Sequence, residues 1–196
     1  SFNGVVGART EKKGYCVAKI IVGGEYVEGV GGGVCQVSTT LYNAALCAGM
    51  NVTCVKNHTI QPSYVPPSLD AMVNSSSSDL RFINPYTTPV FIKAESDSDT
   101  ARITFYGAEP EYVIKTVSRV VSRTEVPEDK EIIDSEHKFV DEVSPAGTRV
   151  RVSYGHAGVK SEAFLRYFTK SGALVREEKI RSDNYAKTQG IVAVAP

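Results

Sequence analysis

One cysteine stands where its thiol could act as a nucleophile. Cys35 follows the glycine run 31–33 and lies at the start of the best predicted helix of the chain. Glycines let the backbone of a substrate come close. The unpaired N–H groups and the positive dipole end at a helix N-terminus favour a thiolate over a thiol, and the same groups can stabilise an oxyanion. We therefore predict a reactive thiol beside an oxyanion hole.

A thiolate mechanism also needs a base, and His58 is the candidate because the other two histidines lie in the second half of the chain. A helix over 36–49 travels about 21 Å away from Cys35, and a strand over 51–57 returns about 23 Å. If the strand packs antiparallel to the helix, His58 arrives beside the helix N-terminus. We expect a hydrogen bond between the two side chains, direct or through one water, over about 3 to 5 Å.

An alternative is that Cys35 is a small buried hydrophobic residue without a chemical role. Cys16, Cys47 and Cys54 are interpreted as core residues. The cysteines form no CxxC pair and no histidines cluster near them, so we expect no metal and no cofactor. Cys35 and Cys47 would lie about 18 Å apart along the helix, too far for a disulfide, and the spacing leaves other pairings open.

Two further side chains could contact a substrate. Arg9, in the turn 7–10, could clamp a carboxylate, although turn arginines are usually only solvated. Tyr64, in the segment 63–67, could line a groove for a peptide, and ordinary packing is the alternative.

The helix that carries Cys35 has the most regular pattern in the sequence. Between Gln36 and Met50 the apolar residues share one face, and Gly49 is a plausible C-cap. The residues of that face are Val37, Leu41, Ala44, Ala45 and Ala48. Alternating segments predict strands over 17–22, 52–56, 80–84, 90–94 and 102–106. We therefore predict an α+β fold, with a mixed or antiparallel sheet and one main helix starting at Cys35.

The second half shows strand patterns only. Its alternating segments are 116–126, 139–143, 149–154, 163–169 and 174–181, and the pair Ser171-Gly172 predicts a hairpin. Five glycines punctuate this half. We place a boundary near residue 110, which gives one domain over 1–108 and an all-β domain over 111–196. Each is expected to fold alone, because each has its own apolar pattern.

Charge and hydropathy exclude several classes of partner. Lys and Arg number 22, as do Asp and Glu, so there is no positive surplus to attract nucleic acid. The sequence has no apolar run of about 18 residues and no signal peptide, so we expect no membrane contact by this chain. It opens at Ser1 inside a patterned stretch, and we expect a monomeric fragment of a longer secreted or membrane-anchored protein.

Several motifs together resemble the VanW domain over residues 1–108. They are Ser1-Phe2-Asn3, Gly7-Ala8-Arg9-Thr10, Gly14-Tyr15, the stretch from Gly31 to Ala44, Asn57-His58, and the stretch from Tyr64 to Ala71. They occur in the order and at the spacings of that family. The second half more loosely resembles the five-glycine domain that accompanies VanW domains in surface proteins of Gram-positive bacteria.

The resemblance implies an extracellular protein of the cell wall that acts on peptidoglycan. VanW takes its name from glycopeptide-resistance clusters, and some clostridial VanW domains are regarded as L,D-transpeptidases. By that analogy Cys35 attacks the carbonyl between diaminopimelate and the terminal D-Ala of a stem tetrapeptide, and the amine of a second diaminopimelate resolves the acyl-enzyme. His58 acts as base and then acid. Oxyanion or substrate contacts are expected from Gly33, Val34, Gln36, Ser38, Arg9 and Tyr64, with the N–H groups of residues 34–36 as oxyanion donors.

Two alternatives stay open. The chain could be a module that binds stem peptides without catalysis, or a cysteine peptidase or amidase in which water resolves the acyl-enzyme. The better-known L,D-transpeptidases carry a His-Gly-Cys run followed by arginine, whereas here Val34 precedes the cysteine and Gln36 follows it.

Overall fold

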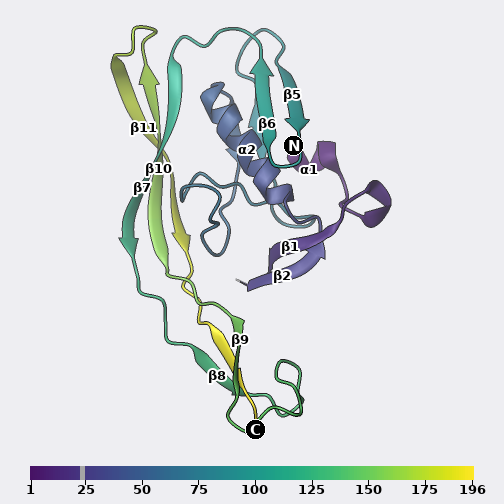
Figure 1. Cartoon of the computed structure of the whole chain (residues 1–196). Coiled ribbons are helices and arrows are strands. Elements are labelled where there is room, and N and C mark those ends of the chain that lie inside the picture. The colour runs from purple at the N-terminus through teal and green to yellow at the C-terminus, as the bar shows by residue number, and fades with distance from the viewer. Residues whose placement is uncertain (23–24) are drawn as a thin grey trace.

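One long helix, α2 (Val34–Cys47), is the central element of the first half in the computed structural model, which describes residues 1–22 and 25–196. The helix lies between strand β6 (Ala101–Tyr106) and strand β7 (Val113–Arg123), as Figure 1 shows. Gly33 caps its N-terminus with φ of 87°, a left-handed conformation that favours glycine. The helix thus begins one residue before the predicted start at Cys35.

The buried face of α2 differs from the predicted one. Its buried residues are Ser38, Thr39, Tyr42, Ala45 and Leu46, whereas Val37, which was expected to face the core, is exposed. Hydroxyl groups explain the difference. Ser38 Oγ donates to the Ala71 carbonyl at 2.6 Å, and Thr39 Oγ1 accepts from the Ala71 N–H at 3.0 Å. These bonds satisfy two buried side chains and hold the chain around Ala71 against the helix.

The strands of the first half form separate antiparallel ribbons, where one mixed or antiparallel sheet was expected. The pairs are β1 (Val17–Val22) with β2 (Glu25–Val30), β3 (Asn51–Cys54) with β4 (Arg81–Ile83), and β5 (Phe91–Ser96) with β6. A short helix, α1 (Phe2–Val6), and a 3-10 turn, η1 (Glu11–Lys13), precede them. The expectation of α+β architecture with one main helix holds loosely, because most of the described elements are strands.

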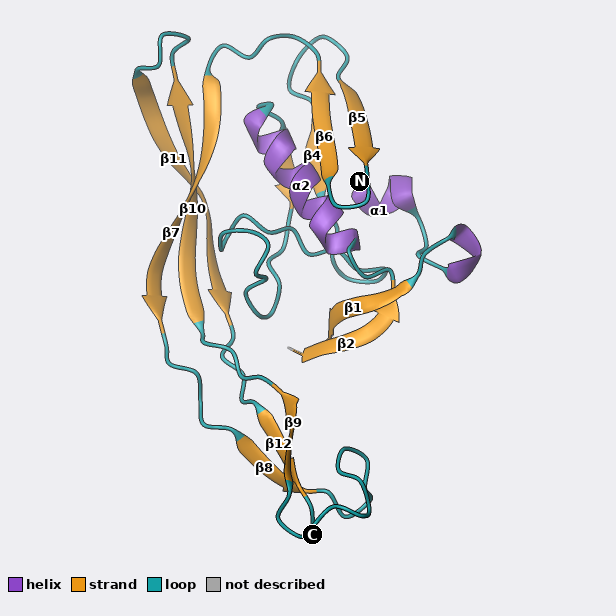
Figure 2. Cartoon of the chain, in the orientation of Figure 1, coloured by secondary structure: helices purple, strands orange, loops and turns teal. Residues whose placement is uncertain are grey.

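The second half consists of strands and loops, as Figure 2 shows. Its upper antiparallel sheet has the order β11 (Leu174–Tyr185), β10 (Val159–Phe168) and β7, and Gly172 turns the β10–β11 hairpin with φ of 93°. The lower sheet has the order β8 (Lys130–Ile133), β12 (Ile191–Val194) and β9 (Arg149–Ser153), with β8 and β12 parallel.

The predicted strand over 139–143 is a loop. The carboxylate of Asp134 accepts the backbone N–H groups of Lys138, Phe139 and Val140 at 2.7 to 3.0 Å. Backbone donors that point at one carboxylate cannot also form a strand ladder. The loop still buries Val140 against β12, which explains its apolar sequence.

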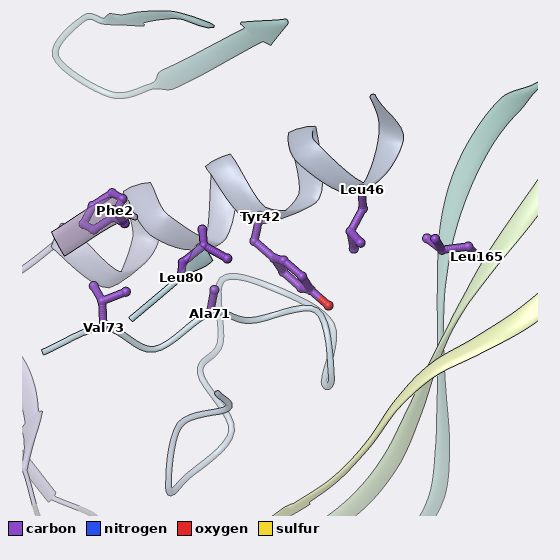
Figure 3. Close-up of a cluster of buried hydrophobic side chains, with 7 residues drawn as sticks. All are labelled: Phe2, Tyr42, Leu46, Ala71, Val73, Leu80 and Leu165. Atoms are coloured by element: carbon purple, nitrogen blue, oxygen red, sulfur yellow. The ribbon is translucent and has the colours of Figure 1, made fainter. Parts of the chain in front are cut away.

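The main hydrophobic core joins the two halves. Figure 3 shows its buried side chains, Phe2, Tyr42, Leu46, Ala71, Val73, Leu80 and Leu165. Leu165 comes from β10, so the upper sheet closes the core around α2 from the far side of the predicted boundary. The division into 1–108 and 111–196 stays a prediction. No helix among the described residues is long and apolar enough to cross a membrane.

Candidate active site

Cys35 is the second residue of α2 and lies half-buried in a cleft of about 880 Å³. The cleft is bordered by β1, the loop before α2 and the segments around His58 and Val73. The Cys35 Sγ lies 3.3 Å from the Val73 carbonyl oxygen and accepts the Val73 N–H at 3.5 Å. The thiol is therefore held in the cleft by the backbone of Val73, whose side chain belongs to the main hydrophobic core.

His58 lies beside Cys35, as expected, although the return strand is shorter than predicted and ends at Cys54 rather than at residue 57. The thiol and the imidazole are close enough to influence each other's charge, and both side chains line the cleft. His58 is only 3% exposed, and it follows β3, which runs back along α2. Because its Nδ1 is engaged elsewhere, Nε2 is the nitrogen left to face the sulfur.

Asp70 binds the other side of the His58 imidazole. The sequence analysis did not identify this partner. Its Oδ2 lies 2.7 Å from His58 Nδ1 and also accepts the His58 backbone N–H at 2.7 Å. The carboxylate is fully buried. Cys35, His58 and Asp70 thus lie in the spatial order in which a nucleophile, a base and an orienting carboxylate lie in thiol and serine hydrolases.

The charges of the three groups support one another. Burial opposes charge on Cys35, but the hydrogen bonds from His58 and the Val73 backbone, with the positive charges of His58 and Arg9, hold the pKa of the thiol below its usual value. Burial also opposes charge on His58, but its hydrogen bonds to Asp70 and Cys35 raise its pKa to about 9. These interactions favour a thiolate beside an imidazolium in the resting site.

The expected oxyanion donors need a correction. The Val34 N–H donates to the Gly31 carbonyl at 3.3 Å, and the Gln36 N–H donates to the Gly33 carbonyl at 3.0 Å. Both donors are thus occupied within the turn that starts the helix. The hydrogen bonds of the described residues leave the Cys35 N–H free, so it is the one backbone donor of residues 34–36 available to an oxyanion.

The glycine run serves packing as well as access. A Cβ at Gly32 would lie 2.5 Å from the Ala18 Cβ and 2.9 Å from its carbonyl carbon, so only glycine lets this loop lie against β1. Gly33 has open space around its Cα and lines the cleft. The expectation that the glycines admit a substrate therefore fits Gly33, and it does not explain Gly32.

Arg9 and Tyr64 both line the cleft. The Arg9 guanidinium donates to Asn3 Oδ1 at 2.5 Å and lies over the Phe2 ring, 5.6 Å from its centroid. Its Nε is buried without a hydrogen-bond partner among the described residues. Tyr64 is 41% exposed and meets the His58 ring edge to face at 6.4 Å between centroids.

Ser38 does not line the cleft, although it was expected among the substrate contacts. It is completely buried, and its hydroxyl is committed to the Ala71 carbonyl. Val34 and Gln36 do line the cleft. Ser38 therefore supports the site from beneath, by holding the chain that carries Asp70 against α2.

The prediction that Cys16, Cys47 and Cys54 are buried is wrong. All three are exposed, and all four cysteines are free. Neighbouring residues in a strand or a helix point in different directions. The apolar neighbours of these cysteines therefore did not indicate that the cysteines themselves are buried. Although Cys47 is exposed as a residue, burial of its thiol raises its pKa, and a hydrogen bond with the Thr116 backbone opposes that rise. No group of three or more potential metal ligands occurs within residues 1–22 and 25–196.

Comparison with known families decides the relationship of the first half. The family model described as VanW like protein matches residues 1–106, more than half of the chain. This chain belongs to the VanW family. Membership indicates a cell-wall-associated protein. The stretch from Tyr64 to Ala71, which contains Asp70, lies inside the matched region. Its acidic residue could therefore have been considered as the group that orients His58.

One curated relative is Uncharacterized protein YoaR of Bacillus subtilis (strain 168), 49% identical over 109 residues. The match covers 56% of this chain and 36% of that protein, so the chain spans about a third of the relative's length. YoaR is itself uncharacterized, so its name adds no activity.

Two solved G5 domains resemble part of the chain at 16% identity each. They are the G5 domain of IgA1 protease, with a TM-score of 0.27 over 45% of this chain and 94% of that one, and HP0197-G5, with a TM-score of 0.20 over 41% and 95%. The five-glycine character of the second half stays a prediction.

Proposed function

We propose that this VanW domain is a cysteine L,D-transpeptidase acting on peptidoglycan stem peptides, with Cys35 as nucleophile. The observation that carries the proposal is the Cys35–His58–Asp70 arrangement at a helix N-terminus, inside an open cleft. A cysteine that served packing alone would have no need of a buried imidazolium and carboxylate behind it, since burying charge is costly.

The first half-reaction forms an acyl-enzyme. The Cys35 thiolate attacks the carbonyl carbon between the L-centre of diaminopimelate and D-Ala, and the charge that develops on oxygen is stabilised by the Cys35 N–H. The C–N bond then breaks, and the His58 imidazolium gives its proton to the departing D-Ala amine. The products are a Cys35 thioester and free D-Ala.

The second half-reaction transfers the acyl group. The side-chain amine of another diaminopimelate attacks the thioester carbonyl, and neutral His58 takes a proton from that amine. The C–S bond breaks and the thiolate leaves, which restores the imidazolium–thiolate pair. The product is an amide cross-link between two stem peptides. Asp70 touches no substrate atom and keeps the His58 ring oriented through both steps.

The cleft has a charge that suits stem peptides. Arg9, Lys19 and Lys56 line it, and no acidic side chain is among its described lining residues. Stem peptides that end in D-Ala and contain diaminopimelate carry free carboxylates, which cations of this kind bind. We assign Arg9 to a substrate carboxylate, because its Nε has no partner among the described residues. Tyr64 would flank the peptide over the His58 ring.

A peptidase or amidase is the second candidate, and one observation favours it. Gln36 is exposed at the cleft and Tyr64 is 41% exposed, so water has access to an acyl-enzyme at Cys35. This enzyme would form the same thioester and release it as an acid. Residues 111–196 would in either case be a G5-type wall-associated domain.

The test is the mass of the intact protein after incubation with disaccharide-tetrapeptide, together with analysis of the products. We expect an added acyl mass, released D-Ala and a cross-linked dimer. Cys35→Ala should abolish all three, whereas the matched variant Cys16→Ala, which removes an exposed thiol away from the cleft, should abolish none. An acyl mass with tripeptide acid and no dimer would select the hydrolase. If wild-type protein gives no acyl mass, no D-Ala and no dimer, it is a non-catalytic module that binds stem peptides.

A further inference from the structure

The last residue of β11 contacts the candidate active site from the second half of the chain. Tyr185 is 1% exposed, and its hydroxyl donates to Asp70 Oδ1 at 2.5 Å. The same hydroxyl oxygen accepts the Ser68 N–H at 2.6 Å. Since burial and the nearby Asp70 charge raise the pKa of Tyr185 well above its ordinary value, the hydroxyl keeps its proton and remains a donor.

With Tyr185 in place, both oxygens of Asp70 have fixed partners. Oδ2 takes the His58 N–H and Nδ1, and Oδ1 takes the Tyr185 hydroxyl. A carboxylate held at both ends cannot rotate about its last bond. The plane of the His58 ring, which must present Nε2 to Cys35, is therefore set in part by a residue 115 positions away from Asp70.

Neighbouring contacts hold β11 in that position. Arg181, on the same strand, donates from its Nη1 to the Asp70 carbonyl at 2.7 Å, and its Nε donates to Asp183 at 2.9 Å. The Ala186 N–H donates to the Thr59 carbonyl at 2.7 Å, one residue beyond His58. The strand is therefore bonded to the segments on both sides of the His58–Asp70 pair.

A second link lies one strand further in the upper sheet. The hydroxyls of Ser68 and Ser161, from β10, are 2.7 Å apart and buried. Together with the Tyr185–Ser68 bond, this link seats the loop that carries Asp70 on the upper sheet. The loop is thus fixed by hydrogen bonds as well as by the shared hydrophobic core.

We propose that the upper sheet of the second half completes the active site, with Tyr185 as a positioning residue that fixes Asp70 and, through it, His58 and Cys35. This proposal rests on the proposed function, since it assigns Tyr185 a part in the same thiol chemistry. Tyr185 does not line the cleft and makes no substrate contact. Its removal should therefore change the reactivity of the thiol and leave substrate binding unchanged.

The experiment measures the rate at which iodoacetamide alkylates Cys35 in the full chain, with Cys16, Cys47 and Cys54 replaced by serine. This readout does not depend on transpeptidation, so the proposal can be tested even if the proposed reaction fails. Tyr185→Phe should slow alkylation about ten-fold. In metal sites, removing the hydrogen-bond partner that orients a ligating side chain costs about ten-fold or more, and Tyr185 has the corresponding place behind Asp70. The matched control is Tyr167→Phe, which removes from the same sheet a hydroxyl bonded to the exposed Glu178.

A double-mutant cycle separates positioning from general stability. If Tyr185 acts through Asp70, then in an Asp70→Asn background Tyr185→Phe should change the alkylation rate less than two-fold, about the limit of additivity for independent sites. The same ten-fold loss in both backgrounds would mean that Tyr185 acts only on the fold, and the proposal would be overturned. An unchanged rate in the single variant would overturn it as well.

A second variant covers failure of Tyr185→Phe to fold, which thermal unfolding would reveal. Arg181→Lys keeps a cation beside Asp183 and withdraws the bond to the Asp70 carbonyl. It should also slow alkylation, by about three-fold or more, and this loss should disappear with Asp70→Asn. A folded Arg181→Lys protein with the wild-type rate would overturn the proposal if Tyr185→Phe cannot be measured. On muropeptides, kcat should fall in either variant while KM stays within about two-fold.

Discussion

The Nδ1 atom of His58 lies 2.7 Å from Oδ2 of Asp70, and neither side chain has appreciable contact with solvent. Each group would be costly to bury in its charged form without the other. Their pairing lets the imidazole remain protonated near a thiol, and it makes the site's behaviour depend on pH in a definite way.

The Cys35–His58 pair should leave stability independent of pH over a defined window. The ordinary pKa values are 6.5 for the imidazole and 9.0 for the thiol, whereas in the folded protein the pKa of His58 is raised to about 9 and that of Cys35 is lowered. At pH values above 6.5 and above the lowered pKa of Cys35, but below about 9, the unfolded chain holds one proton on the thiol and the folded chain holds one on the imidazole. Equal numbers of bound protons give no slope in the free energy of unfolding.

Cys35→Ala removes this compensation. With His58 alone, a raised pKa contributes stability that is complete below pH 6.5 and is lost as the pH rises through the folded value. In urea unfolding, the variant should lose on the order of 1 kcal/mol more than wild type between pH 6.5 and 9. His58→Gln combined with Cys35→Ala should not show this extra loss. Parallel curves for wild type and Cys35→Ala would contradict the ion pair.

Cys35 should be the first cysteine to react at acidic pH. All four thiols are free and the other three are exposed, so access alone would favour the others. Charge favours Cys35, because its pKa is lowered while that of Cys47 is raised. Peptide mapping after brief alkylation at about pH 6 should find Cys35 modified at least ten times faster than Cys47. Equal labelling of these two would count against a thiolate at rest.

Asp70→Asn should separate orientation from binding. The amide cannot hold an imidazolium as a carboxylate does, so the pKa of His58 should fall from about 9 toward its ordinary 6.5. The change can be followed by NMR of the ring protons. D-Ala release should fall by roughly 10² to 10⁴, the upper value being the loss in the corresponding serine protease variant. An unchanged imidazole titration would remove Asp70 from the mechanism.

Arg9→Gln should weaken substrate binding more than chemistry. Arg9 lines the cleft, so loss of its charge should raise KM for the tetrapeptide about ten-fold, as expected for one charge-assisted bond. A tetrapeptide with amidated carboxyl groups should show the same high KM with wild-type protein and little further change with the variant. Lys12→Gln, an exposed change in η1, serves as the control. If Arg9→Gln had the wild-type KM for both the free and the amidated tetrapeptide, Arg9 would be excluded as a ligand of the substrate carboxylate.

Ser38→Ala should affect stability, because its hydroxyl satisfies the Ala71 carbonyl inside the core. Leaving that oxygen without a donor should lower the free energy of unfolding by about 1 to 3 kcal/mol. Thr40→Ala, which removes a hydroxyl bonded to the Gln36 carbonyl within the helix, should cost less. Denaturant unfolding distinguishes them. A large rise in KM for Ser38→Ala, with no loss of stability, would instead support the original expectation that Ser38 contacts the substrate.

The pairing of Cys35 with His58 was predictable because it follows from local geometry. A helix and the strand after it have fixed rises, so their lengths bring the chain back toward the helix N-terminus, although β3 ends at Cys54 and residues 55–57, expected as strand, are irregular. The strand over Val17–Val22 and the hairpin at Gly172 were likewise predicted from alternation and turn chemistry. The second half was also correctly expected to lack helices, which holds for its described residues.

Contacts between distant segments explain what was missed. Asp70 follows no periodic element, and its role depends on how a loop is seated by Ser68 and by Tyr185, 115 positions away from it. The loop over 139–143 has the alternation of a strand, but the carboxylate of Asp134 captures its backbone donors. Strands β8 and β12 have only four residues each, and β2 carries a glycine and two glutamates, so their pairing is set by neighbours rather than by pattern.

The bond between Tyr185 and Asp70 has a consequence for how such proteins can be recombined. The family match ends at residue 106, so a recombination event that transferred only the matched region would not transfer Tyr185. A foreign partner domain could still present apolar side chains to α2 and restore the core. Unless it also brought a hydroxyl to the same point, Oδ1 of Asp70 would be buried without a donor. Exchange of the second half is therefore limited by a single polar atom as well as by the fit of the two surfaces.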